Sequence, residues 1–313
     1  MAHYLVTGGA GFIGSNLTRH LLEAGETVRI VDNLSTGKPE NLAPIRSDVE
    51  FIEDTICDTD VCRRVAAGMD FVLHQAALGS VPRSVADPQA SNQANITGTL
   101  NMLVAARDAG VERFVCAGSS SVYGDTVQLP KVETMTPRPL SPYGVTKLAK
   151  EHYCRVFWQV YGMPTIVLRY FNVYGPRQDP QSMYAAVIPR FARALLRSEK
   201  AVIYGDGLQT RDFTFIEDCI QANLLACTAP KAANGEAFNI AFGEQVTIRA
   251  VFDILRELLG VEAEPEYTGP RPGDVRDSLA DTAKARRLLG YEPRNDIRTG
   301  LAKTSDWYRE HLA

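Results

Sequence analysis

The sequence predicts an α/β protein in which a doubly wound parallel sheet is joined to a smaller mixed α/β C-terminal domain. In the first half, short apolar runs alternate with amphipathic segments, as in successive βαβ units. The chain has 313 residues, which favours one large unit with a smaller companion over a single core. After about residue 172, loops rich in Pro, Gly and Gln separate the helices, which indicates a change of domain.

The elements follow from periodicity and from the residues that begin or end helices. The expected strands are rich in β-branched and aromatic residues, and span 3–8, 27–33, 49–56, 69–77, 113–121 and 164–172. A helix over 12–25 ends at Gly25, and one over 98–110 carries Leu100, Leu103 and Val104 at core spacing. In the second half we expect helices over 185–197 and 247–259.

Two domains are expected, with a soft boundary between them. Residues 1–171 form the first, and 172–209 with 243–313 form the second. The segment around 210–242 is expected to return in part to the first domain and to add strands there.

Composition excludes several classes of protein. A net charge of −4 argues against nucleic-acid and membrane-surface partners, and no stretch reaches the roughly 20 apolar residues of a membrane span. The N-terminus lacks the pattern of a signal peptide. The six cysteines form no CxxC pair and have no metal-ligand spacing, so we expect reduced thiols, no metal site and a cytoplasmic location.

A glycine-rich turn predicts a Rossmann-type dinucleotide site. Gly8, Gly11 and Gly14 follow the first strand and open the first helix, where a pyrophosphate approaches the backbone. Asp32 ends the second strand, 18 positions after Gly14. A carboxylate there accepts hydrogen bonds from a ribose and repels a 2′-phosphate, so we expect NAD rather than NADP. Thr36 and Gly37 follow where the ribose and phosphates are expected.

The segment "SPYGVTK" predicts a catalytic pair. Ser141 and Pro142 are typical of a helix start, and Tyr143 and Lys147 then share one side of that helix. A nearby ammonium favours the phenolate of a tyrosine and brings its pKa towards neutral pH. The pair is common by chance, but it lies downstream of a dinucleotide motif. Another face of the helix carries Val145, Ala149, Val156 and Val160.

Three serines, Ser119, Ser120 and Ser121, end the expected strand 113–121. The carboxyl ends of parallel strands form the site of a doubly wound sheet, so Ser119 is expected to share the substrate proton with Tyr143. Polar capping of the strand end is the alternative.

These motifs, together with Asn95 and "RYFNVYGP", resemble those of extended short-chain dehydrogenase/reductases. More closely, the whole chain resembles UDP-hexose 4-epimerases, above all the bacterial UDP-N-acetylglucosamine 4-epimerases of surface-polysaccharide pathways. The resemblance implies an isomerase that retains NAD. Tyr143 takes the O4 proton while a hydride passes from C4 to NAD⁺. The transient 4-keto sugar then rotates about its diphosphate link, and the hydride returns to its other face. Lys147 holds the nicotinamide ribose and Ser119 assists at O4.

The resemblance also assigns binding residues. Those placed at the cofactor, besides the glycines, Asp32, Thr36, Gly37, Tyr143 and Lys147, are Phe12, Ile13, Asn33, Ile56, Gln75, Ala76, Ala77, Asn95, Tyr170 and Val173. Arg211, Arg271 and Asn172 correspond to the groups that hold the diphosphate. Tyr204 and Val187 are placed at uracil and Asp274 at the uridine. Either Asp54 or Thr55 takes the place of an aspartate that contacts adenine.

The sugar is expected to be acetylated. Ser119–Ser121 lack the acid that dehydratases and decarboxylases of this type carry. Gly79 and Ser80 replace a lysine, and Ser278 replaces a tyrosine that closes the pocket to acetylated sugars. Gln178 and Ala186 complete the likeness and are assigned to substrate binding.

Several alternatives remain open. The first is an enzyme that acts on UDP-glucose and UDP-galactose, either alone or in addition to the acetylated sugars. The second is an enzyme that acts on UDP-glucuronate, with Arg83 or Arg276 pairing with its carboxylate. A non-catalytic NAD-binding sensor or scaffold is the alternative outside enzymes. A homodimer is expected through the helix of Tyr143 and the helix at 98–109, with Phe157 and Trp158 in the interface or in the core.

Overall fold

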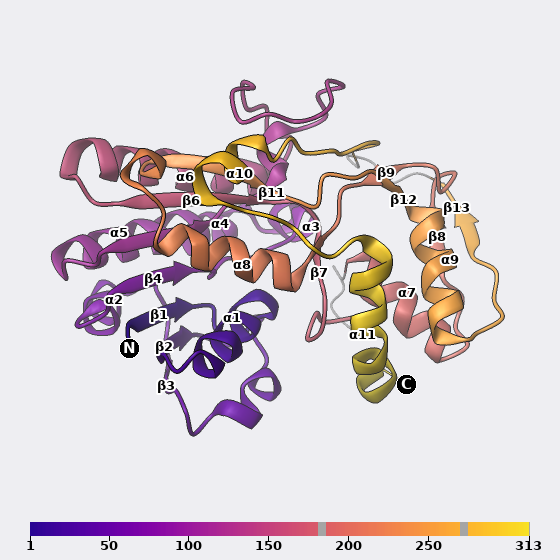
Figure 1. The fold of residues 1–313 in the computed structure, drawn as a ribbon, viewed down its shortest axis with the longest axis horizontal. Coiled ribbons are helices and arrows are strands. Elements are labelled where there is room, and N and C mark those ends of the chain that lie inside the picture. The colour runs from indigo at the N-terminus through magenta and orange to yellow at the C-terminus, as the bar shows by residue number, and fades with distance from the viewer. Residues whose placement is uncertain (181–185, 270–274, 313) are drawn as a thin grey trace.

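A seven-stranded parallel sheet forms the centre of the molecule (Figure 1). The computed structural model describes residues 1–180, 186–269 and 275–312. The strand order is β3-β2-β1-β4-β5-β6-β11. The strands are β1 His3–Thr7, β2 Thr27–Asp32, β3 Glu50–Glu53, β4 Phe71–His74, β5 Arg113–Ala117, β6 Thr165–Tyr170 and β11 Glu236–Ile240. The order reverses between β1 and β4, and such a switch point opens a crevice at the carboxyl ends of the strands.

Helices cover both faces of the sheet. One layer holds α2 Thr59–Ala66, α5 Gly98–Asp108 and α6 Pro142–Tyr161, which contact one another in that order. The opposite layer holds α1 Phe12–Glu23 and α8 Ile216–Cys227. Between β4 and α5 the chain forms α3 Val81–Ala86, α4 Pro88–Asn92 and a π-helical turn Gln93–Thr97.

The alternation of side chains along each strand separates two apolar cores. Val6 of β1 packs on the α1–α8 side, whereas Leu5 packs on the α2–α5–α6 side. Because both faces are buried, the inner strands β1, β4 and β5 are mostly apolar, whereas the edge strand β3 has exposed Glu50 and Glu53 at its ends.

The chain returns to the sheet late. β11 pairs in parallel with β6, with Phe238 opposite Leu168, and α8 contacts both β5 and β6. The seventh strand of the sheet is therefore supplied by residues 236–240, long after β6 in the sequence.

A second lobe lies beside the sheet, at the right of Figure 1. Its helices α7 Val187–Leu196, α9 Ile248–Leu259 and α11 Ile297–Leu312 pack together. Around them lie the strand pairs β8 Val202–Tyr204 with β13 Glu266–Thr268, β9 Thr210–Arg211 with β12 Val246–Thr247, and β7 Val173–Tyr174 with β10 Thr214–Phe215. α10 Ala283–Leu289 contacts β11 and α8.

The fold class predicted from the sequence is confirmed. The strands are shorter than expected because several carboxyl ends leave the sheet as loops that line the site. The helix α2 was not anticipated, although Asp58 caps it by accepting hydrogen bonds from the Asp60 and Val61 amides.

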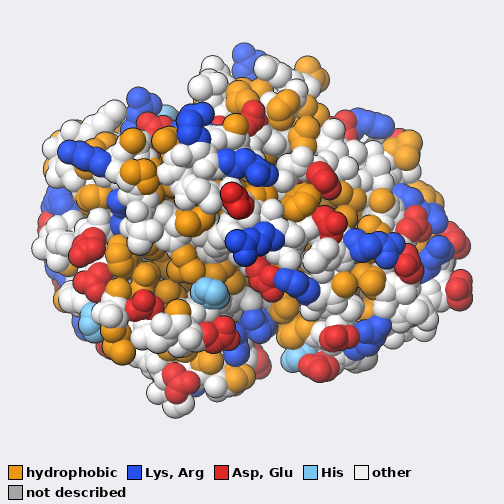
Figure 2. All heavy atoms as spheres, viewed as in Figure 1, with side chains coloured by type: hydrophobic (Ala, Val, Ile, Leu, Met, Phe, Trp, Pro, Cys, Tyr) orange, Lys and Arg blue, Asp and Glu red, His pale blue; other side chains and the backbone are white. Residues whose placement is uncertain are grey.

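The surface is mixed in charge and partly apolar. Acidic and basic side chains are interspersed over the face shown in Figure 2. Of the apolar residues on one face of α6, Val145, Val156 and Val160 are exposed, the last to 66%. Among the described residues, no helix is both long and apolar enough to cross a membrane.

Candidate active site

The turn between β1 and α1 has a backbone that only glycine fits. Gly8 has a φ of +69°, and a Cβ there would lie 2.8 Å from the Ala76 backbone. A Cβ at Gly14 would collide with the Gly8 carbonyl oxygen. The backbone and the first turn of α1 therefore form an open cradle at a helix N-terminus, a position suited to a phosphate.

Asp32 ends β2 beside this cradle. Its carboxylate accepts hydrogen bonds from the amides of Ala10 at 2.9 Å and Leu34 at 2.8 Å. Burial raises the pKa of Asp32, and these two amides act in the opposite direction. A Cβ at Gly37 would lie 2.8 Å from Asp32 Oδ2, so the loop after β2 approaches the carboxylate closely.

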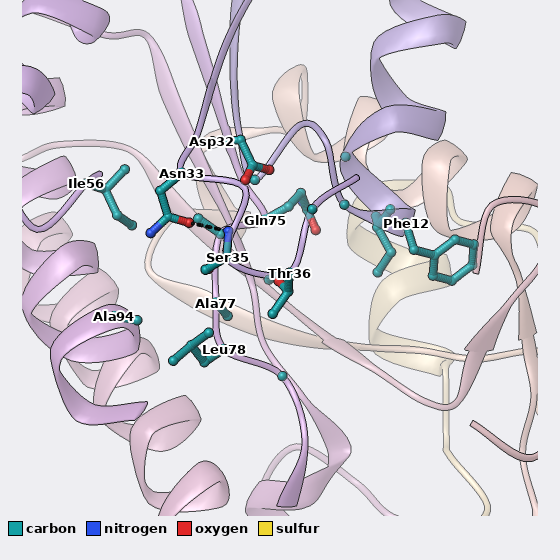
Figure 3. Close-up of a pocket in the computed structure, with 18 of the residues that line it drawn as sticks. Phe12, Asp32, Asn33, Ser35, Thr36, Ile56, Gln75, Ala77, Leu78 and Ala94 are labelled. Carbon is teal, nitrogen blue, oxygen red and sulfur yellow. Dashed lines mark hydrogen bonds between the residues drawn. The ribbon is translucent and has the colours of Figure 1, made fainter. Parts of the chain in front are cut away.

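A cavity of about 900 Å³ runs from the cradle to α6. In Figure 3, Ile56 and Ala94 lie at one side and Phe12 at the other, with Asp32, Asn33 and Thr36 between them. Most of the residues predicted at the cofactor and sugar line it, namely Gly8, Gly11, Phe12, Ile13, Gly14, Asp32, Asn33, Thr36, Gly37, Ile56, Gln75, Ala76, Ala77, Gly79, Ser119, Ser120, Tyr143, Lys147, Tyr170, Asn172, Val173 and Gln178.

The helix α6 begins as predicted at the mouth of this cavity. Ser141 Oγ accepts a hydrogen bond from the Gly144 amide at 3.1 Å, and Pro142 occupies the first turn. The Tyr143 amide donates to Ser84 Oγ at 3.0 Å, which fixes the helix start against α3.

Tyr143, Lys147 and Ser119 converge. Lys147 Nζ lies 5.6 Å from the centre of the Tyr143 ring and donates to the Ala117 carbonyl at 2.9 Å. Burial raises the pKa of the Tyr143 phenol, and a hydrogen bond with Ser119 and the Lys150 ammonium act in the opposite direction. Burial lowers the pKa of Lys147 to about 8.

Three predicted residues lie beside this cavity without lining it. Asn95 is buried in the π-helical turn, where its Oδ1 accepts from the Leu78 amide at 2.7 Å and its Nδ2 donates to Thr146 Oγ1 at 3.0 Å. Asn95 therefore holds the loop after β4 in place without lining the cavity itself. Ser80 Oγ caps α3 by accepting from the Arg83 amide. The buried Ser121 Oγ has no hydrogen-bond partner among the described residues.

A smaller cavity of about 240 Å³ adjoins the first, because Asn172 and Val173 line both. Of the residues predicted at the substrate, it is also lined by Ala186, Val187, Tyr204 and Arg211. The guanidinium of Arg190 lies over the Tyr204 ring, 5.6 Å from its centre.

Other predicted substrate residues lie elsewhere. Ser278 lines neither cavity, and its Oγ accepts from the Asp212 amide at 3.2 Å. Arg276 pairs at the surface with Asp206 at 3.2 Å and also lines neither cavity. Arg271 and Asp274 lie outside the described residues. Asp54 and Thr55 both line the larger cavity, and Asp54 pairs with Arg64.

Sequence reasoning missed some residues that line the larger cavity. Lys38 and Asp179 form an ion pair of 2.9 Å that joins the loop after β2 to the loop after β7. Arg177, in the second loop, has a φ of +69° and hydrogen-bonds to Asn16 of α1. The available signal was position, since Lys38 follows Gly37 and the other two flank Gln178.

Comparison with known proteins agrees with this geometry. Residues 4–241 match the model of the NAD dependent epimerase/dehydratase family. The chain belongs to this family. The cradle that a Cβ at Gly8 or Gly14 would fill, and the carboxylate of Asp32 beside it, fit NAD, the cofactor of the family. The sequence-based prediction of an NAD-dependent epimerase is thus confirmed at the level of the family.

Three solved epimerases are similar to this chain over nearly their whole length. The UDP-glucose 4-epimerase of Thermotoga maritima with UDP-glucose is 40% identical, with a TM-score of 0.94 over 99% of this chain and 100% of that one. The UDP-N-acetylglucosamine 4-epimerase of Methanobrevibacter ruminantium with UDP-N-acetylmuramic acid is 38% identical, with a TM-score of 0.93 over 98% of each. The UDP-glucuronic acid 4-epimerase of Bacillus cereus with UDP-glucuronic acid and NAD is 35% identical, with a TM-score of 0.91 over 98% and 99%.

Proposed function

We propose that the protein is a UDP-sugar 4-epimerase that prefers UDP-N-acetylglucosamine and UDP-N-acetylgalactosamine and also accepts UDP-glucose and UDP-galactose. The convergence of Tyr143, Lys147 and Ser119 on one cavity supports the epimerase chemistry. The relatives described above act on UDP-sugars that differ at C2 or C6, so the choice of sugar rests on the residues of this chain.

Each residue has a proposed role in the reaction. Gly8, Gly14 and Asp32 would hold NAD, which would supply the hydride acceptor and donor for C4 of the sugar. Tyr143 takes the proton from the O4 hydroxyl as the C4–O4 bond becomes a carbonyl, and returns it when the hydroxyl re-forms. Ser119, which hydrogen-bonds to the Tyr143 phenol, also holds O4 of the sugar. Lys147, whose Nζ lies 5.6 Å from the centre of the Tyr143 ring, favours the phenolate and orients the cofactor ribose.

The two cavities suggest how the substrate is divided. We assign NAD and the sugar to the larger cavity, most of whose lining comes from the proposed sheet domain of residues 1–171 with part of 210–242. The uridine is assigned to the smaller cavity in the second lobe, with Val187 and Tyr204 against uracil and Arg211 at the diphosphate. Asn172 borders both, and its side chain donates to the Asp212 carbonyl at 2.9 Å.

The preference for an acetylated sugar rests on one observation. Gly79 lines the larger cavity, and a Cβ built there meets no atom within 4 Å. Open space at this position suits an acetamido group, whereas a long side chain there would fill it. Gln178 lines the same cavity, and Ala186 lines the smaller one.

The test uses purified protein without added NAD. Incubation with UDP-N-acetylglucosamine and with UDP-glucose is followed by resolution of the 4-epimers. We expect both to be converted, the acetylated sugar faster, and Tyr143→Phe to lose most of the activity. Gly79→Lys should depress turnover of the acetylated sugar more than that of UDP-glucose. Faster turnover of UDP-glucose by the unchanged enzyme would refute the preference and leave the mechanism standing.

UDP-glucuronate is the second candidate, because Arg83 lines the larger cavity, as Gly79 does. Conversion of UDP-glucuronate that is faster than that of both other sugars, and that Arg83→Met abolishes, would favour this substrate. Turnover of no sugar, even with added NAD, would favour a sensor or scaffold.

We also propose a homodimer formed through α5 and α6. Val145, Val156 and Val160 of α6 are exposed, whereas Phe157 is buried in the core. Trp158 packs against Gly235 of the same chain. Light scattering should give twice the mass of one chain, and Val156→Glu should shift it to a monomer. Val127→Glu, at a fully exposed apolar residue away from α6, serves as the control.

Six free thiols further support a reducing, cytoplasmic location.

A further inference from the structure

A second lysine of α6 lies behind the catalytic pair. Lys150 is 0% exposed, and its Nζ is buried without a hydrogen-bond partner among the described residues. It follows Lys147 by three positions and Tyr143 by seven, so all three side chains share the helix face that packs on the sheet. The sequence predicted that Tyr143 and Lys147 share this face, but Lys150 was not singled out.

An ammonium group in such a place destabilises a fold. A buried polar group without a partner costs free energy, and a buried charge costs more. Burial lowers the pKa of Lys150 to about 8, so the side chain is charged in most molecules at neutral pH. A methionine would fill the same space without this penalty. Packing therefore does not explain a lysine at this position.

Of the two titratable groups of the sheet that act on Lys150, His74 offers no compensating charge, whereas Cys116 offers one. His74 of β4 is held between Thr7 and Thr99 at 2.9 Å each, and burial with both lysine charges keeps its pKa well below the usual range. Cys116 of β5 is the other neighbour. Burial raises the pKa of its thiol, but a hydrogen bond with Cys154 and the lysine charges outweigh this and lower it to about 6.

The groups on α6 and β6 are engaged elsewhere. Glu151, whose carboxylate charge acts on Lys147, is held by Arg169 of β6 at 2.7 Å. Lys147 itself donates to the Ala117 carbonyl. The charges on Lys150 and Tyr143 act on each other, and Lys150 favours the phenolate.

We propose that Lys150 is a positioning residue for the epimerase reaction, which holds a second positive charge behind Tyr143 and so favours the phenolate that accepts the O4 proton. The inference rests on the proposed role of Tyr143. It gives this buried ammonium, whose Nζ has no hydrogen-bond partner in the described parts of the chain, a role at the adjoining site in addition to its attraction to the Cys116 thiolate. A site of this kind gives up stability for chemistry.

The test replaces Lys150 by neutral residues, Lys150→Met and Lys150→Gln, in the NAD-bound enzyme. Both variants are expected to fold, with Tm equal to or above that of the unchanged enzyme. The rising limb of kcat/KM against pH should move about one unit towards alkaline pH, with about a tenfold loss at pH 7 that recovers as the pH is raised. Arg155→Met removes an exposed charge from the same helix and should leave the profile unchanged.

A spectroscopic titration separates this inference from the proposed function. The tyrosinate absorbance of the enzyme minus that of Tyr143→Phe reports the ionisation of Tyr143 alone, whatever the activity. We expect its midpoint to move to higher pH in Lys150→Met. An activity loss with an unmoved profile and midpoint would overturn the inference, as would unchanged activity or the failure of both neutral variants to fold. Full activity of Tyr143→Phe would instead overturn the proposed function, and the titration would still decide the effect of Lys150.

Discussion

Arg169 of β6 and Glu151 of α6 form a buried ion pair, with Arg169 Nη2 2.7 Å from Glu151 Oε2 and side chains only 6% and 7% exposed. Arg169 Nε also donates to Glu151 Oε1 at 3.0 Å, so the pair is bidentate, and Nη1 donates to the Tyr123 hydroxyl at 2.8 Å. Glu151 lies one turn after Lys147. The pair therefore fixes the catalytic helix to the sheet.

Removal of one partner should destabilise the protein strongly. Glu151→Gln leaves the Arg169 charge buried and uncompensated, and we expect a loss of roughly 3–5 kcal/mol in the free energy of unfolding, measured in urea. Glu257→Gln is the control, because Glu257 pairs with Arg298 at the exposed surface and its loss should leave the free energy of unfolding nearly unchanged. Similar losses in the two variants would show that burial of the pair is not what matters.

The close approach at Gly14 makes a second prediction. In Gly14→Ala the new Cβ would collide with the Gly8 carbonyl oxygen, so the cradle must open and NAD should be lost. The measurement is the amount of NAD that remains with the protein after gel filtration. Gly269→Ala, at an open position, should retain NAD as the unchanged enzyme does. Retention by Gly14→Ala would mean that the pyrophosphate does not bind at this turn.

The ion pair between Lys38 and Asp179 should slow the release of NAD. Both side chains are partly exposed, so the pair is worth at most about 1 kcal/mol, which is about a fivefold change in rate. Asp179→Asn keeps Lys38 and should release NAD up to about fivefold faster, as followed by exchange with labelled NAD. A double-mutant cycle with Lys38→Met isolates the pair. Additive effects of the two changes on the rate of NAD release would show that the Lys38–Asp179 ion pair does not slow that release.

Asp212 predicts a dependence of stability on pH. Burial raises its pKa to about 6, although the amides of Ala280 and Gly243 donate to it. Below about pH 4 the group is protonated in both the folded and unfolded states. As the pH rises from about 4 to 6 the unfolded chain loses the proton more readily, so folding stability should fall by up to about 3 kcal/mol.

Asp212→Asn should remove this slope, whatever its effect on stability at a single pH. The measurement is the free energy of unfolding of both proteins at several pH values between 4 and 7. Parallel curves for the two proteins would show that another group carries the dependence.

The parts that could be predicted from sequence were local. The glycine turn, Asp32 and the start of α6 each depend on a few adjacent residues whose backbone chemistry is specific. The position of β11 was expected only in outline, because strand pairing over 60 residues leaves no local signal.

The helix α6 shows why periodicity was insufficient. A stripe of valines on an amphipathic helix usually packs on the core, but Val145, Val156 and Val160 are exposed here. The buried face instead carries Lys147, Lys150 and other polar groups, because it borders the site. Chemistry and a neighbouring surface, rather than hydrophobicity alone, decide the orientation of this helix. The same limit applies to Ser278, whose place depends on contacts with distant Asp212.

The late return of the chain to the sheet has a consequence for synthesis on the ribosome. β6 has an unpaired edge until residues 236–240 emerge, well after the first lobe of strands and helices has been made. An open parallel edge is a template for pairing with other chains. Translation that stalls before β11, or a truncation there, should therefore yield a product prone to aggregation. Part of the second lobe is synthesised before β11 can complete the sheet.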